Sequence, residues 1–89
     1  MAKFSAAMTE IEGKEMAIIW VDRKHLSNPE ELKKYLIFYQ DLLKMNDVAL
    51  MMLDPKDEPI YYGKKEIVEI LKQHNWKGHE WKEYSIEKE

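Results

Sequence analysis

Two runs of the sequence are apolar at every position: MAIIWV at residues 16–21 and VALMML at residues 48–53. A strand with one wet face alternates apolar and polar residues, whereas a strand that is apolar throughout is covered on both faces. Both runs are far too short to cross a bilayer. In a chain of 89 residues, two such strands raise the question of what covers the second face of the sheet.

The segments around these runs predict the order ββα-ββα-β. Gly13 supplies a positive φ for a turn between the first two strands, and the prolines at 55 and 59 frame a polar loop after the third. The alternation of apolar and polar residues predicts the limits of the other strands, and apolar residues three and four positions apart predict the limits of the helices. The expected strands are 4–9, 16–21, 48–53, 60–62 and 80–86, and the expected helices are 29–45 and 64–74.

The first of these helices has the stronger local signals. Asn28 can cap free backbone N–H groups, Pro29 suits the first helical position, and Glu30 and Glu31 favour the positive end of the helix dipole. Apolar residues then recur three and four positions apart, which predicts a buried stripe. The stripe comprises Leu32, Tyr35, Leu36, Tyr39, Leu42 and Leu43, with Phe38 and Met45 on one flank.

These elements predict a single α+β domain over residues 1–89, with a mixed sheet of four or five strands and both helices packed on one face. Strands two and three, and strands four and five, are each joined through a helix. Such connections favour parallel pairs with right-handed crossovers. Helices on one face leave the other face of the sheet bare.

A second copy of the chain is the expected cover for that bare face, because soluble monomers seldom expose large apolar patches. The sequence therefore predicts a homodimer whose interface comprises Met16, Ile18, Trp20, Met51 and Leu53. Three alternatives remain open: the N-terminal strand folds across the face, the sheet curls into a half-barrel, or an open groove takes a hydrophobic ligand or a protein partner. Ile37 lies opposite the buried stripe and is either an ordinary exposed residue or part of a partner surface.

Composition narrows the class of partner. The net charge is −3 and Arg23 is the only arginine among 14 basic residues, so nucleic acid is not an expected partner. The chain has no cysteine, which favours a reducing, cytoplasmic setting and excludes thiolate metal sites. Nothing in the sequence reaches the length of a membrane span. We expect no cofactor and no bound metal.

Asp22, His25 and Asp54 are the candidate catalytic residues. Asp22 and His25 follow the second strand, and Asp54 follows the third. If those strands are parallel neighbours, these side chains lie at one edge of the sheet, where α/β proteins bind ligands. Asp22 and Asp54 could then share a cation, or Asp22 could orient His25 as a general base. The alternative is that both aspartates are solvated strand ends.

Two further clusters could bind ligands. Tyr62, Lys64 and Lys65 lie at the start of the second helix, where an anion would be favoured, although Gly63 also suits a tight turn. His74 is expected on the buried stripe of that helix, and His79 follows five residues later. Neither cluster matches a stricter phosphate or zinc motif.

The sequence therefore contains no catalytic signature, and its leading interpretation is a small non-enzymatic interaction or regulatory module. The alternative is a small enzyme or ligand-binding domain that uses the edge formed by Asp22, His25 and Asp54.

Overall fold

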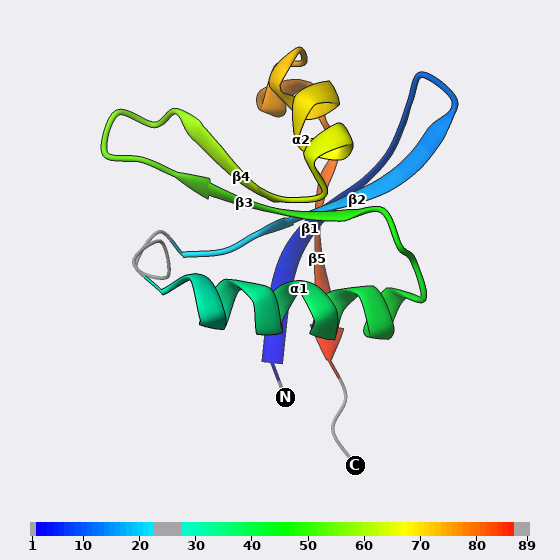
Figure 1. Ribbon diagram of the computed structural model, residues 1–89, viewed down its shortest axis with the longest axis vertical. Helices are drawn as coiled ribbons and strands as arrows, with labels where there is room; N and C mark the ends of the chain where they lie inside the picture. The colour runs from blue at the N-terminus through cyan, green and yellow to red at the C-terminus, as the bar shows by residue number, and fades with distance from the viewer. Residues whose placement is uncertain (1, 23–27, 87–89) are drawn as a thin grey trace.

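The computed structural model describes residues 2–22 and 28–86. These residues contain five strands, two α-helices and one short 3₁₀ turn (η2), joined by loops (Figure 1). The strands form one mixed sheet in the order β4-β3-β2-β1-β5. The predicted α+β class and element order are confirmed. The bounds are β1 Ala2–Ile11, β2 Lys14–Trp20, α1 Pro29–Leu43, β3 Val48–Leu53, β4 Pro59–Gly63, α2 Lys65–Lys72, η2 Trp76–Gly78 and β5 Trp81–Ile86.

The first two strands form the expected hairpin. β1 and β2 pair antiparallel, with Ala7 opposite Ile18. The turn residues Glu12 and Gly13 both have positive φ, 53° and 80°, which suits a tight two-residue hairpin turn. β1 also pairs antiparallel with β5 along its other edge, so both strands of the hairpin are interior strands of the sheet.

α1 begins at the predicted cap. The Asn28 side chain accepts a hydrogen bond from the Glu31 backbone N–H at 3.2 Å, and the Glu31 carboxylate accepts one from the Asn28 side-chain amide at 3.2 Å. The Tyr35 hydroxyl also donates to Glu31, at 3.0 Å. The helix ends at Leu43, where Lys44 takes a left-handed conformation with a φ of 55°. The Asn28 side chain thus satisfies one of the backbone donors that a helix start leaves free.

The helix returns the chain to a strand that runs parallel to β2. Residues 17–20 of β2 pair with residues 48–51 of β3, as predicted for a crossover through a helix. β4 then pairs antiparallel with β3. Gly63 is required at the end of β4, since a Cβ there would lie 3.1 Å from the Val48 carbonyl oxygen and 3.3 Å from the Ala49 Cα.

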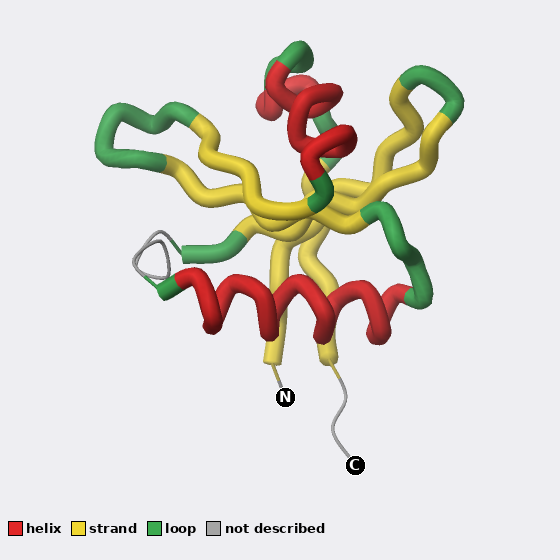
Figure 2. Tube along the Cα trace, in the orientation of Figure 1, coloured by secondary structure: helices red, strands yellow, loops and turns green. Residues whose placement is uncertain are grey.

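The two helices lie on opposite faces of the sheet, so the prediction that both pack on one face is wrong (Figures 1 and 2). Successive residues of a strand point to opposite faces. Ala17 and Ile19 pack on the side of α1, whereas Met16 and Ile18 pack on the side of α2. The β1–β2 turn and the β3–β4 loop rise on either side of α2, so the twisted sheet partly surrounds that helix.

The prediction that strands four and five are a parallel pair is also wrong. β4 and β5 lie at opposite edges of the sheet, because the segment from α2 to η2 crosses the sheet before β5 joins β1. This crossing is what covers the second face. That face has its own apolar core, made of Ala7, Ile11, Met16, Ile18, Ala49, Met51, Ile67 and Leu71.

Substitution of Leu71 tests whether the fold needs α2 to cover this face of the sheet. The side chain is fully buried against the sheet. We expect Leu71→Ala to lower the free energy of unfolding by about 2–4 kcal/mol, because the substitution removes buried methyl groups and leaves a cavity. The measurement is equilibrium denaturation in urea at constant protein concentration. Ile60→Ala is the control, since Ile60 is 37% exposed and should cost less than about 1 kcal/mol; equal losses in the two variants would contradict this role of α2.

Candidate functional site

Of the predicted catalytic residues that the structure describes, Asp22 lines a depression at the ends of β2 and β3, and Asp54 does not. Trp20, Val21, Asp22 and Leu53 line one open depression of about 260 Å³ there. The parallel pairing of β2 and β3, on which that prediction depended, is confirmed. His25 lies outside the residues that the structure describes.

Asp54 has a structural role at this edge. Its carboxylate accepts hydrogen bonds from the backbone N–H groups of Lys56 at 2.8 Å and Glu58 at 2.9 Å. Its own backbone N–H donates to the Glu58 carbonyl at 2.9 Å. These bonds close the β3–β4 loop in the way that aspartate commonly closes turns. The carboxylate oxygen is therefore occupied by the loop.

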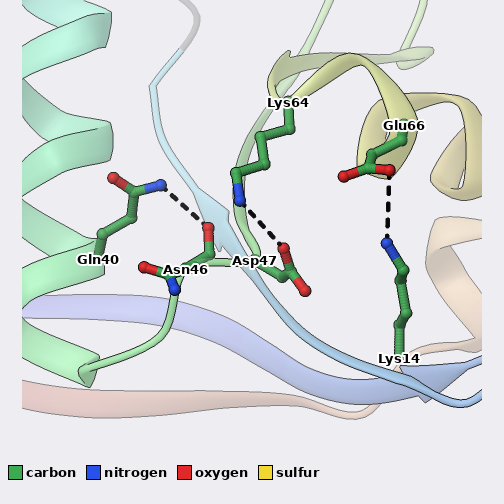
Figure 3. A network of polar contacts seen from close by, with 6 residues as sticks. All are labelled: Lys14, Gln40, Asn46, Asp47, Lys64 and Glu66. Carbon is green, nitrogen blue, oxygen red and sulfur yellow. Dashed lines mark hydrogen bonds and ion pairs between the residues drawn. The ribbon is translucent and has the colours of Figure 1, made fainter.

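The candidate anion site at the start of α2 is a region of mixed charge. Tyr62 packs on the α1 side of the sheet, away from the side that carries α2. The Lys64 ammonium pairs with Asp47 at 3.5 Å, and Lys14 pairs with Glu66 at 3.5 Å (Figure 3). These two ion pairs connect the start of α2 to β2 and to the loop before β3, and they place carboxylates beside ammonium groups. Lys65 is exposed at the first position of α2. The arrangement does not concentrate positive charge for an anion.

The residues predicted as a dimer interface are mostly buried within one chain. Met16, Ile18 and Met51 have no exposed surface, because α2 covers them. Leu53 is partly buried at the margin of the same core, and Trp20 is 37% exposed. The bare face that led to the predicted interface is therefore absent from the described fold.

A cluster of three tryptophans closes one end of the core between α2 and the sheet. Trp20 contacts Trp76 and Trp81 with ring centroids 5.2 and 5.4 Å away, in edge-on geometry. The Trp81 indole N–H donates to the Trp76 carbonyl at 2.9 Å. These rings pack against one another and cover apolar side chains, as aromatic groups do in small cores.

Two histidines that are five positions apart in the sequence line the same open cavity, of about 520 Å³. His74 lies beyond the end of α2 and is exposed, so its predicted place on the buried stripe is wrong. The end of β1 contributes Glu10 to the cavity, the β1–β2 turn contributes Glu12, and the segment around η2 contributes His79. Within residues 2–22 and 28–86, no group of three or more possible metal ligands comes together.

The surroundings of His79 lower the pKa of its imidazole. Burial, and then the positive charge of His74, hold the pKa of His79 below its usual value of 6.5. Its Nε2 atom is buried and makes no hydrogen bond among the described residues, and the same is true of the Tyr61 hydroxyl. A buried polar atom without a partner favours the neutral form of the imidazole.

The outward side of α1 exposes several large apolar side chains. Ile37 is 54% exposed, Phe38 45% and Leu42 41%. The exposure of Ile37 was expected, whereas Leu42 was placed in the buried stripe. The difference arises because α1 packs chiefly against β3, so the apolar stripe is wider than the surface beneath it. The sequence already indicated that the apolar stripe is wide, since Phe38 and Met45 extend it on one flank.

Asp54→Ala tests the structural role of this carboxylate. We expect the variant to lower the free energy of unfolding by about 1–2 kcal/mol, because two loop N–H groups lose their acceptor. Asp54→Asn should lose less, since its side-chain oxygen can still accept. Urea denaturation measures both, and an unchanged stability for Asp54→Ala would show that the loop does not need these bonds.

His79 predicts a pH dependence of stability. Its folded pKa is lowered, so the stabilisation is complete above about pH 6.5 and is lost as the pH falls through the folded value. The free energy of unfolding should fall more between about pH 7.5 and 5.5 for the wild type than for His79→Gln, which cannot titrate there. Parallel pH profiles from urea denaturation would contradict the prediction. His74, Glu10 and Glu12 face the same cavity and stay unchanged in both proteins.

Comparison with known proteins identifies no family for this chain. No protein-family model matches the chain, and neither a curated protein nor a solved structure matches it. Among the described residues, neither helix has the length and apolar character needed to cross a membrane. The function is therefore inferred from the surfaces of the described residues, where the exposed large apolar side chains of Ile37, Phe38 and Leu42 lie on one helix, α1.

Proposed function

We propose that the protein is a small non-enzymatic interaction module that associates with a second copy of itself through the outward side of α1. The observation that carries the proposal is the exposure of Ile37, Phe38 and Leu42 on one helix. Single apolar residues on a surface are ordinary, but Phe38 and Leu42 lie one turn apart on the helix and Ile37 precedes Phe38, so α1 exposes apolar area of the kind that marks an interface.

Coverage of the central strands supports this choice of surface. β2 and β3 have α1 on one side and α2 on the other, so their apolar residues are already packed within the chain. The homodimer expected from the sequence is thus proposed on a helix in place of the sheet face. The net charge of −3 argues against nucleic acid as the main partner, and the cysteine-free composition suits the cytoplasm.

A small enzyme or ligand-binding domain is the second proposal. The depression lined by Trp20, Val21, Asp22 and Leu53 supports it, since it places Asp22 beside apolar side chains at the ends of parallel strands. The hydrogen bonds that occupy Asp54 weaken it. The interaction module is the better supported function, because each of the three apolar side chains on α1 is more exposed than Trp20 at that edge.

Ile37→Asp tests the leading proposal. Light scattering on a size-exclusion column, across micromolar concentrations, should give the wild type twice the mass of one chain. We expect Ile37→Asp to raise the dissociation constant at least tenfold, about 1.4 kcal/mol, because it places a charge in an apolar contact.

The matched control is Ile60→Asp, which makes the same change at an exposed isoleucine that belongs to β4 and not to α1. It should shift the dissociation constant less than threefold. A wild type that stays monomeric at all concentrations would overturn the proposed self-association.

A further inference from the structure

The outward side of α1 carries charges in an order that complements itself when the helix is reversed. Lys34, Ile37, Phe38 and Asp41 are spaced by three and four positions and therefore form one diamond on the helix surface. All four side chains are exposed. The two apolar residues lie at the centre of the diamond, and opposite charges lie at its two ends.

A two-fold rotation about the centre of this diamond matches every position with a complementary one. Two antiparallel copies of α1 would place Lys34 opposite Asp41 of the second copy and Ile37 opposite Phe38 of the second copy. Closed two-fold interfaces use the same patch twice, so each of these contacts occurs twice. The same rotation brings Lys44 near the first-turn glutamates of the second copy.

We propose that two copies of the chain pair antiparallel along α1, with Ile37 and Phe38 packed at the two-fold axis and Lys34 paired with Asp41 across it. This inference rests on the proposed self-association and specifies its geometry. Neither the Lys34 ammonium nor the Asp41 carboxylate makes an ion pair within residues 2–22 and 28–86, so both charges are available to a second copy.

Position in the fold and surface area are consistent with this pairing. α1 forms a layer on the side of the sheet opposite α2 (Figures 1 and 2), and the four side chains of the diamond are exposed. The three exposed apolar side chains of α1 are flanked by charged residues, which is the arrangement of an apolar interface centre with a polar rim. A stable interface buries about 800 Å² on each partner, and helices pack with axes about 8–10 Å apart. A contact of that size has to extend along most of the 15 residues of α1.

Charge reversal separates this geometry from other modes of association. Lys34→Glu places a carboxylate opposite Asp41 of the second copy, and Asp41→Lys places an ammonium group opposite Lys34 of the second copy. Each variant alone therefore creates two like-charge contacts. We expect each to raise the dissociation constant at least tenfold, measured by light scattering across micromolar concentrations.

An equimolar mixture of the two variants gives the decisive result. In a mixed dimer, the new carboxylate faces the new ammonium group, and the original Asp41 faces the original Lys34. The mixture should therefore regain the mass of a dimer at concentrations where each variant alone is monomeric. The double variant K34E/D41K should likewise associate within about threefold of the wild type. Circular dichroism should show the same helix content in all variants, because both positions are exposed.

Lys72→Glu is the matched control, since it reverses an exposed charge in the last turn of α2. It should leave the dissociation constant unchanged. A dimeric wild type that is indifferent to Lys34→Glu and Asp41→Lys would overturn the antiparallel pairing while leaving self-association intact. The same holds if the variants dissociate but the mixture fails to recover. A monomeric wild type would overturn the proposed function itself.

Discussion

The fold depends on one constraint, which is that two neighbouring strands need cover on both of their faces. β2 and β3 are apolar at almost every position and lie side by side in parallel. A parallel pair requires a crossover, and α1 provides both the connection and the cover of one face. The other face would expose Met16, Ile18 and Met51 to water. α2 removes that cost by crossing to the opposite side of the sheet.

This second crossing explains features that otherwise look unrelated. The chain leaves β4 at one edge of the sheet and returns as β5 at the other edge, because α2 and η2 pass over the face between them. Gly63 permits the close approach to β3 from which α2 starts. The tryptophans at 20, 76 and 81 meet where η2 leads into β5 and close the core at that end. The two histidines share a cavity because the same segment brings them against the β1–β2 turn.

Because both faces of the central strands are packed within the chain, the proposed interaction surface lies on α1 and not on the sheet. Among the described residues, three of the six exposed large apolar side chains, those of Ile37, Phe38 and Leu42, lie on α1. The candidate polar sites are open to solvent, and several of their side chains have structural roles. Asp54 accepts hydrogen bonds that close a loop, and Lys64 pairs with Asp47, so both side chains already have partners within the chain.

The sequence by itself determined the elements and the apolar character of the two central strands. Helix caps, hairpin turns and apolar periodicity depend on residues within a few positions of one another, so the Asn28 cap, the Gly13 turn and the β2–β3 crossover were all predictable. Only the tertiary structure decided which face each helix covers, the separation of β4 from β5, the occupied carboxylate of Asp54 and the meeting of the two histidines. The apolar stripe of α2 fits either side of an apolar sheet equally well. The choice between the sides is made by contacts between residues that are far apart in the sequence, and no local pattern records it.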